Sequence, residues 1–522
     1  MIFTQAIQRN AQVYKNQIAL KCADRTHTWG ELEDRIARLA AGLQVNGVKP
    51  GDRVAILALN SDRYLEFYYA TAWVGAVMVP LNTRWSIKEN EYALNDSGSV
   101  MLMVDDTFLK SGNELKQACG LVNNFVYLGD NNTPEGMLNY EEVIASNLPI
   151  SAFESSTTDM LGIFYTGGTT GFPKGVMLSH KNIWVSSIAI MTEMNFNNRD
   201  LGSMMMVAGP MFHLAAGAMC WSSVIGGVPI TVVPAFNVDD VLTCIERDKV
   251  TDCLLVPTMI SMLLADKALA TADLSTLKQI IYGASPMPEG TLLEAMEKIP
   301  TVGFIQAYGQ TELAPACSLL PAKYHTLEGP LSGKIRSAGR PVFTLNVSIR
   351  DEHNNELATN QIGEICAKGE NVMMGYWNNP EQTSAALANG WLHTGDAGYI
   401  DEDGFIFLVD RVKDMIVSGG ENVFSAEVES ALSKHPDVHE VAVIGIPCQQ
   451  WGEAVHAIVR LKPDTSNEEQ NIITFCREYI AGYKVPRSIE FRNEPFPITG
   501  AGKIQKNELR EVYWKDQERN IN

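Results

Sequence analysis

Short apolar runs alternate with helical patterns through the first half of the chain, and this rhythm constrains the fold more than any other feature. Residues 53–57 form one such run, a helical stretch follows to about residue 74, and residues 77–80 form the next run. Strands that alternate with helices are typical of βαβ units, which predict α/β layers with largely parallel sheets. The pattern recurs around residues 100–104, 161–165, 204–207, 230–233, 253–256 and 279–282.

The rhythm changes near residue 340. Residues 347–350, 363–367 and 404–409 are expected strands separated by Gly, Asn and Asp, which indicates a smaller β-rich subdomain at about 335–410. After Asp410-Arg411 the pattern is α+β. The 522 residues are too many for one small core. We therefore predict a large N-terminal domain over residues 1–410 and a small C-terminal domain over residues 411–522.

One long stretch without charge could be mistaken for a membrane span. No Asp, Glu, Lys or Arg occurs between Leu201 and Val238, which is enough residues to cross a bilayer. The stretch contains Pro210, Pro229 and Pro234 as well as His213. A strand, a short helix and a second strand, all buried in a large core, explain these residues better.

Composition and charge exclude several classes of protein. The chain is 46% hydrophobic and 20% charged, as is usual for globular proteins, and its net charge is −20. That charge disfavours nucleic-acid binding, which needs a basic surface. Nine cysteines without a C-x-x-C pair predict no disulfide framework and no zinc site, and fit a reducing compartment such as the cytoplasm. The N-terminal residues have no long apolar run, so we expect no signal peptide.

Residues 165–175, YTGGTTGFPKG, have the composition of a phosphate-binding loop. Glycines allow backbone N–H groups to close on a phosphate, threonine hydroxyls add donors, and Lys174 adds positive charge. The P-loop of nucleotide hydrolases has Gly directly before its Lys and a hydroxyl residue directly after it. Here Pro173 precedes Lys174 and Gly175 follows it, so a P-loop ATPase is disfavoured.

Further motifs follow in a fixed order along the chain. Each is weak or moderate by itself, and the order and separations together are very specific. They are YGQTE at residues 308–312, WLHTGD at 391–396, DRVKD at 410–414, SGGENV at 418–423 and GAGKI at 500–504.

With these motifs the chain resembles the acyl-activating, adenylate-forming enzymes, which include acyl- and aryl-CoA synthetases, nonribosomal peptide adenylation domains and beetle luciferases. The resemblance covers nearly the whole chain and is closest to the stand-alone CoA ligases. It implies a large domain of two α/β sheets plus a β subdomain, and a small mobile C-terminal domain. It also implies ATP, Mg²⁺ and coenzyme A as cofactors, and two steps: a carboxylate attacks the α-phosphorus of ATP to release pyrophosphate, and the CoA thiol then displaces AMP.

The same resemblance implies roles for individual residues. Thr166 and Glu312 would bind Mg²⁺, and Thr311 would donate to the α-phosphate. Asp396 would accept from the ribose hydroxyls, with Arg411 close to the ribose or a phosphate. The β- and γ-phosphates would lie on Thr166, Gly167, Gly168, Thr169, Thr170 and Lys174, and the adenine on Gly283, Gln306, Ala307 and Tyr308.

Two lysines and a histidine complete the implied site. Lys503 would contact the substrate carboxylate and the α-phosphate, where it neutralises charge as two anions meet. Lys413 matches the family's hinge, about which Lys503 would leave the site while the loop with Gly419 and Gly420 enters. His213 would position the acid and not act as a base, because a carboxylate is already ionised at neutral pH.

The acid itself is less well defined. The segments expected around the acyl group are small and apolar, and no Asp or Glu is placed to bind an amino group. A medium- or long-chain fatty acid fits such a pocket, and so does an aromatic or alicyclic acid. We rank the fatty acid first and keep the aromatic or alicyclic acid as the alternative. The expected segments are residues 214–219, 283–285, 307 and 309–315.

Other functions stay open at this point. The acyl group could pass to a carrier protein in trans or to oxygen instead of CoA. An inactive acyl- or nucleotide-binding protein is disfavoured, because Glu312, Asp396 and Lys503 are all present. The partners are then a small carboxylic acid, ATP and CoA, without nucleic acid or an integral membrane segment. The sequence leaves the oligomeric state open, although homodimers are common among such enzymes.

Overall fold

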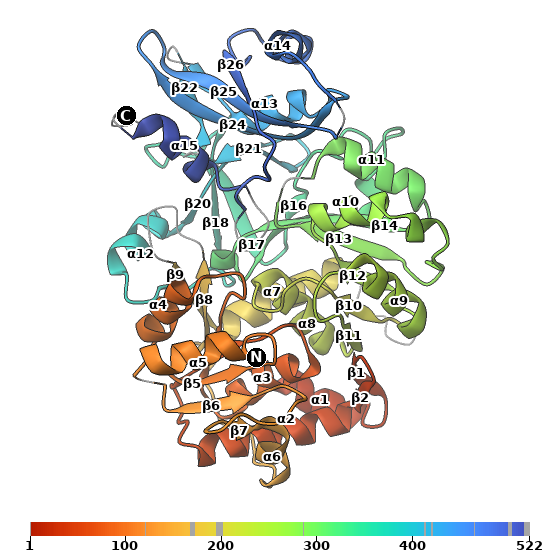
Figure 1. Ribbon diagram of the computed structural model, residues 1–522, viewed down its shortest axis with the longest axis vertical. Helices are drawn as coiled ribbons and strands as arrows, with labels where there is room; N and C mark the ends of the chain where they lie inside the picture. Colours follow the sequence, from red (N-terminus) through yellow and green to blue (C-terminus); the bar gives the residue numbers. More distant parts are fainter. Residues whose placement is uncertain are drawn as a thin grey trace. The chain divides into compact units, whose positions relative to one another are not determined.

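The computed structural model describes residues 2–120, 122–166, 173–194, 202–285, 287–411, 414–418, 421–463, 465–498 and 504–515. Its contacts divide the chain into two compact units (Figure 1). The first unit comprises residues 1–284, 294–346 and 367–392. The second comprises residues 285–293, 347–366 and 393–522.

An eight-stranded sheet forms one half of the first unit. Its order is β19-β9-β8-β4-β3-β5-β6-β7, with β8 to β7 parallel and with β9 and β19 antiparallel to their neighbours. In β3 the residues from Val54 to Leu57 are all buried, as expected for a parallel strand covered on both faces. The strands are β3 (Arg53–Leu57), β4 (Val77–Pro80), β5 (Ser99–Val104), β6 (Asn124–Tyr127), β7 (Leu138–Asn139), β8 (Met160–Thr166), β9 (Lys174–Ser179) and β19 (Gly375–Tyr376).

A nine-stranded sheet forms the other half. Its order is β16-β15-β14-β13-β12-β10-β11-β1-β2, parallel from β14 to β1 and antiparallel at both edges. The strands are β1 (Ile18–Cys22), β2 (Arg25–Thr28), β10 (Met205–Val207), β11 (Ile230–Val232), β12 (Asp252–Leu254), β13 (Gln279–Gly283), β14 (Gly303–Gly309), β15 (Ala316–Leu320) and β16 (Arg340–Pro341).

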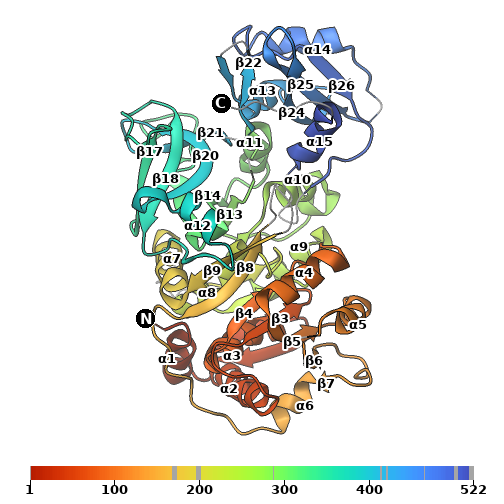
Figure 2. The ribbon, with the colours of Figure 1, turned by 90° about the vertical axis from the view of Figure 1, so that its left-hand side faces the viewer.

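The helices connect these strands, and a side chain caps the start of several of them. Thr28 accepts from the Glu31 N–H, and Glu31 accepts from the Thr28 N–H, which is a capping box. Helices α2 and α3 pack against one another (Figure 2). The helices are α1 (Gln5–Val13), α2 (Trp29–Val45), α3 (Asp62–Trp73), α4 (Ile87–Ser97), α5 (Leu109–Ala118), α6 (Tyr140–Ala145), α7 (His180–Glu193), α8 (Leu214–Gly226), α9 (Val238–Asp248), α10 (Pro257–Ala265), α11 (Glu289–Lys298) and α12 (Pro380–Ala386), with the 3₁₀ helices η2 (Lys267–Ala270), η3 (Thr311–Leu313), η4 (Ala322–Tyr324) and η5 (Ala388–Gly390).

The uncharged stretch between Leu201 and Val238 forms β10, α8 and β11, as predicted. Helix α8 has 13 residues, of which most are buried. A membrane span needs about 20 apolar residues in a helix. Among the described residues, no helix is both long enough and apolar enough to cross a membrane.

The second unit holds two smaller sheets. Most of a four-stranded sheet, β17-β18-β20-β21, belongs to it, and a five-stranded sheet has the order β23-β22-β25-β24 with β26 beside β25. Val428, Val443 and Val455 are in the core beneath the second sheet. The elements are β17 (Leu345–Arg350), β18 (Gly363–Gly369), β20 (Leu392–Ile400), β21 (Ile406–Arg411), β22 (Ile416–Ser418), β23 (Glu421–Val423), α13 (Ser425–Leu432), β24 (Val438–Cys448), β25 (Gly452–Leu461), α14 (Glu469–Cys476), β26 (Ser488–Phe491) and α15 (Lys506–Trp514).

The predicted fold class is confirmed. The large N-terminal part contains two α/β sheets and the C-terminal part is small and α+β. The boundary at residues 410 and 411 stays a prediction.

All nine cysteines are free, and Cys448 is the one that is not fully buried.

Candidate active site

The candidate site of the first unit begins at the carboxyl ends of the parallel strands in the nine-stranded sheet. Val207 of β10 pairs with Leu254 of β12, and the register continues through β13 to β14. Carboxyl ends of parallel strands meet at one edge of a sheet, where α/β proteins bind ligands. The three segments that follow β10, β13 and β14 carry predicted site residues: 208–213, 284–285 and 310–312.

Two glycines lie too close to neighbouring backbone to carry a side chain: Gly283 of β13, beside β14, and Gly309 at the end of β14, beside the segment that leads into β15. A Cβ on Gly283 would lie 2.1 Å from the Ala307 carbonyl oxygen, and a Cβ on Gly309 would lie 1.8 Å from that of Pro315. Both contacts are with backbone, so neither can relax by moving a side chain. Glycine at these two positions therefore brings bare backbone to the edge where the adenine was predicted to bind.

Two glutamine side chains present unused polar atoms at this edge. Within the described part of the chain, Oε1 of Gln306 and Nε2 of Gln310 are buried and have no hydrogen-bond partner. Buried polar atoms are rarely left unpaired, so each is suited to a polar ligand. An adenine ring offers both an amino donor and ring-nitrogen acceptors, and these two residues fit it. Tyr308, on the same strand, is also buried.

His213 is fixed at the start of α8. It is the N-cap residue, and its Nδ1 accepts from the Ala215 N–H at 3.3 Å. Since Nδ1 accepts, the ring proton of a neutral imidazole resides on Nε2. The preceding loop is held by Asn60, which accepts from the Met211 N–H at 2.7 Å, and by the Tyr68 hydroxyl, which donates to the Met211 carbonyl. This geometry makes Nε2 a donor, consistent with a positioning role.

The predicted metal and phosphate residues are linked by a residue that the sequence analysis missed. The Tyr376 hydroxyl donates to Oε1 of the buried Glu312 at 2.9 Å, and the Lys174 ammonium stands 5.2 Å from the centroid of the Tyr376 ring. Burial, followed by the charge of Glu312, raises the pKa of Tyr376 well above its usual range. The hydroxyl therefore remains a donor at all relevant pH values.

Backbone pairing sets the positions of these side chains. Lys174 pairs with Thr166 across β8 and β9, and Tyr376 pairs with Val176 across β9 and β19. Thr166 and Glu312 offer hydroxyl and carboxylate oxygens, which are the ligands that Mg²⁺ prefers. Their chemistry thus fits the predicted metal, and Thr311 is adjacent in η3.

In the second unit the structure brings Asp396 and Arg411 together. They are partners across β20 and β21, with Asp396 Oδ1 at 3.8 Å from Arg411 Nε. Asp396 is half-buried, with 20% of its side chain exposed, and Arg411 is more exposed at 42%. A carboxylate at such a half-open position can accept hydrogen bonds from ligand hydroxyls.

Several predicted residues lie outside the described part of the chain: Gly167, Gly168, Thr169, Thr170, Lys413, Gly419, Gly420 and Lys503. The described residues that flank three of these segments are paired with each other. Thr166 pairs with Lys174, Ser418 with Glu421, and Ile498 with Ile504.

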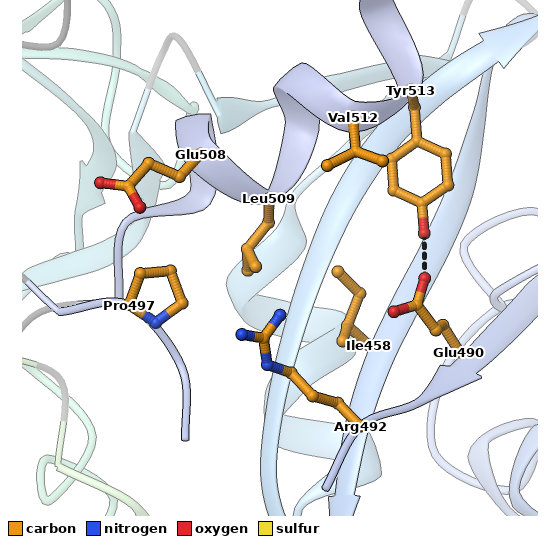
Figure 3. Close-up of a pocket in the computed structure, with 8 residues that line it drawn as sticks. All are labelled: Ile458, Glu490, Arg492, Pro497, Glu508, Leu509, Val512 and Tyr513. Carbon is orange, nitrogen blue, oxygen red and sulfur yellow. Dashed lines mark hydrogen bonds between the residues drawn. The ribbon is translucent and has the colours of Figure 1, made fainter. Parts of the chain in front are cut away.

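A pocket of about 260 Å³ lies elsewhere in the second unit, between α15 and strands β25 and β26 (Figure 3). It is lined by Ile458, Glu490, Arg492, Pro497, Glu508, Leu509, Val512 and Tyr513, none of which is a predicted site residue. The Tyr513 hydroxyl already bonds to Glu490 and to His456. Tyr513 and Glu490 are thus engaged with each other, and no residue of the predicted site lines this pocket.

Comparisons with known proteins agree with this geometry. Residues 7–377 match the family model of the AMP-binding enzymes, and residues 427–503 match that of the AMP-binding enzyme C-terminal domain. A feruloyl-CoA synthase from an Amycolatopsis species is 36% identical, over 96% of this chain and 97% of that protein. A fatty acid–[acyl-carrier-protein] ligase, ScoC, from Streptomyces coeruleorubidus is 33% identical, over 99% of this chain and 98% of that protein. The solved structure of o-succinylbenzoate CoA synthetase from Bacillus subtilis, in complex with its acyl-adenylate, has a TM-score of 0.83 at 30% identity and covers 99% of both chains.

The chain therefore belongs to the AMP-binding enzyme family, whose members have the adenylate-forming fold. It is an acid–thiol ligase of the AMP-forming acyl-CoA synthetase class, and its cofactors are ATP, Mg²⁺ and coenzyme A. The P-loop ATPase considered above is thereby excluded.

Proposed function

We propose that the enzyme activates a hydrophobic monocarboxylic acid that carries no second charge. The observation that carries this proposal is the segment around α8: from residue 202 to residue 238 the chain has no Asp, Glu, Lys or Arg, and His213 stands at the start of the helix. A dicarboxylate or an amino acid would need a counter-charge near the acyl group.

An aryl acid is the first candidate. Trp221 lies against Gly217, where a Cβ would come within 2.9 Å of the ring, and Tyr68 packs on Trp221 at 5.4 Å between centroids. This face of α8 is thus filled by aromatic rings, which leaves the start of the helix, with the partly exposed His213 and Ala215, for the acid. A short planar acid needs less depth than a long alkyl chain. The relative named feruloyl-CoA synthase supports the same choice.

The second candidate is a medium- or long-chain fatty acid, which we expected first from the sequence analysis. The side chains at residues 214–218 are mostly Ala and Gly, and such small residues leave room for an alkyl chain. The relative ScoC, named for a fatty acid and a carrier protein, supports this candidate and also transfer to a carrier.

The proposed roles follow the predicted order of events. Residues 166–170 and Lys174 hold the β- and γ-phosphates, so that pyrophosphate leaves when the carboxylate attacks the α-phosphorus. Lys503, Thr311 and His213 orient and neutralise the reacting groups. Bound Mg²⁺, with Thr166 and Glu312 as ligands, would offset phosphate charge. Asp396 and Arg411 hold the ribose.

The second half-reaction is proposed to follow a rotation at Lys413, between domains bounded at residues 410 and 411. The loop with Gly419 and Gly420 then enters the site, where the CoA thiol attacks the acyl carbon. We also propose a cytoplasmic location, which the nine free cysteines support. We further propose that the enzyme is a homodimer, and light scattering would test this assembly.

A substrate panel tests the proposal. Pyrophosphate and AMP release are measured with Mg-ATP and acetate through palmitate, benzoate, cinnamate and ferulate, each with and without CoA. AMP release that requires CoA and an aryl acid supports the first candidate, and a requirement for a fatty acid supports the second. Pyrophosphate release that is independent of CoA would indicate a different acyl acceptor. Release with an added dicarboxylate such as succinate, and with none of these monocarboxylates, would refute the proposal.

A further inference from the structure

A glutamate on β18 holds the turn that leads into Asp396. Oε2 of Glu364 accepts from Nδ1 of His393 at 2.7 Å, and Oε1 of the same carboxylate accepts from the Gly395 N–H at 2.9 Å. Both carboxylate oxygens of Glu364 therefore accept hydrogen bonds from the three residues before Asp396, one from His393 and one from Gly395. Hydrogen bonds to an ionised carboxylate are stronger than neutral ones, so this is a firm attachment.

A threonine fastens the same turn a second time. The Thr394 hydroxyl donates to the Ile365 carbonyl at 2.7 Å and accepts from the Asp396 N–H at 3.1 Å. Gly395 has φ of +71°, a conformation that favours glycine. The backbone of Asp396 is thus set by contacts with two consecutive residues of β18, while its carboxylate faces Arg411.

A metal site is the alternative explanation for this cluster. Glu364, Cys366 and His393 offer ligand atoms within 4.8 Å of one another. Among the described residues, this is the one cluster of three such side chains that could hold a metal ion. However, 2.7 Å between Glu364 and His393 is the length of a hydrogen bond, with the proton between the two atoms. The Cys366 sulfur lies 3.5 Å from the same Nδ1 of His393, so the three side chains already contact one another directly.

We propose that Glu364 is a positioning residue for nucleotide recognition: through His393 and Gly395 it fixes Asp396 where the ribose hydroxyls bind. This inference rests on the proposed role of Asp396 and adds a residue to which no role is yet assigned. Glu364 itself does not touch the nucleotide. Its contribution should therefore depend on the ribose hydroxyls and on the presence of the Asp396 carboxylate.

Direct binding measurements test the inference without the need for an active acid. Isothermal calorimetry compares Mg-ATP with its 2′-deoxy and 3′-deoxy analogues for the wild type, Glu364→Ala, Glu364→Gln and the exposed control Glu352→Ala. We expect Glu364→Ala to weaken ATP about tenfold, as for loss of a charged hydrogen bond, and to weaken at least one deoxy analogue less than about twofold. Glu364→Gln, which keeps an acceptor for Gly395, should fall between, and Glu352→Ala should bind like the wild type.

A double variant separates positioning from general damage. In an Asp396→Ala background, Glu364→Ala should add almost no further loss, because two residues that act through one contact are not additive. Equal weakening of ATP and both analogues by Glu364→Ala, or full additivity with Asp396→Ala, would overturn the inference alone. A wild type that binds ATP and both deoxy analogues equally would overturn the proposed ribose role of Asp396 as well. Failure of the acid panel, by contrast, would leave these binding results intact.

Discussion

The Tyr376 hydroxyl lies 2.9 Å from Oε1 of Glu312, and this hydrogen bond joins the two sheets of the first unit. Tyr376 belongs to β19 at the edge of the eight-stranded sheet, whereas Glu312 follows β14 of the nine-stranded sheet. The same segment is tied again where the Met373 N–H donates to the Glu312 carbonyl at 2.9 Å. Glu312 is thus held by its backbone and its side chain.

Removal of the Tyr376 hydroxyl should weaken catalysis without loss of the fold. Tyr376→Phe keeps the ring beneath Lys174 but removes one hydrogen bond to a carboxylate, which is worth about 1.5–3 kcal/mol. We expect adenylation to slow by tenfold or more, at about 1.4 kcal/mol per tenfold, and to need more Mg²⁺. Pyrophosphate release measured against Mg²⁺ concentration checks this, with the exposed Tyr479→Phe as the control. An unchanged Mg²⁺ requirement would contradict the role of Tyr376.

Gly283→Ala should separate β13 from β14. The new Cβ would lie 2.1 Å from the Ala307 carbonyl oxygen, so the strands have to move apart, and such overpacking costs about 1–3 kcal/mol. We expect weaker ATP binding and a lower melting temperature. Gly290→Ala is the matched control, because its Cβ would meet nothing within 4 Å. Calorimetry and thermal melting of both variants test this, and equal behaviour of the two would count against it.

A buried ion pair should stabilise the second unit. Lys506 Nζ lies 2.7 Å from Glu429 Oε1 and 2.7 Å from the Ser425 hydroxyl. Burial alone would lower the pKa of Lys506, but the charges of Glu429 and Asp410 outweigh it and raise that pKa.

Lys506→Met leaves the Glu429 carboxylate buried without its cation, so we expect a loss of about 3 kcal/mol in the free energy of unfolding. Urea unfolding measures the change, with the exposed Lys515→Met as the control. The double variant Lys506→Met/Glu429→Gln should recover part of the loss, and no recovery would show that the charge of Glu429 is not the cause.

His180 should make the free energy of unfolding depend on pH. Burial lowers its pKa to about 4, whereas in the unfolded chain it titrates near its usual pKa of about 6.5. Between these values the unfolded state binds more protons, so stability falls as the pH drops from 6.5 to 4, by up to about 3 kcal/mol. His180→Gln should flatten this dependence, although His325, also with a pKa lowered to about 4 by burial, keeps part of it. The exposed His353→Gln should leave the profile unchanged, and a profile identical in His180→Gln and wild type would refute the prediction.

Lys503→Ala should separate the two half-reactions. If Lys503 neutralises the carboxylate and the α-phosphate, its loss should nearly abolish adenylate formation from acid and ATP. Thioester formation from supplied acyl-adenylate and CoA should be spared. Quench-flow measurement of each half-reaction decides the matter, and an equal loss in both would remove that role from Lys503.

The sequence predicted what depends on local patterns. The strand at residues 53–57, the helix after it and the strand at residues 77–80 were all expected, because apolar runs between turn residues encode them locally. The uncharged stretch around His213 was likewise predicted as a strand, a helix and a strand. The motifs then gave candidate site residues by resemblance.

Contacts between distant segments could not be predicted in the same way. Tyr376 pairs with β9 and bonds to Glu312, and no periodicity in one sequence encodes such a register. Gly375-Tyr376 was visible only as an aromatic residue after a glycine. Glu364 has no local signal either, since its role depends on a turn that begins at His393, on a different strand.

The distribution of cysteines has a practical consequence. Eight of the nine thiols are buried, and Cys448, at the end of β24 in the second unit, is the partly exposed one. A maleimide dye added to the native enzyme should therefore attach at Cys448 without removal of any other cysteine. The unmodified chain thus carries its own labelling position, from which fluorescence could follow the C-terminal part during turnover.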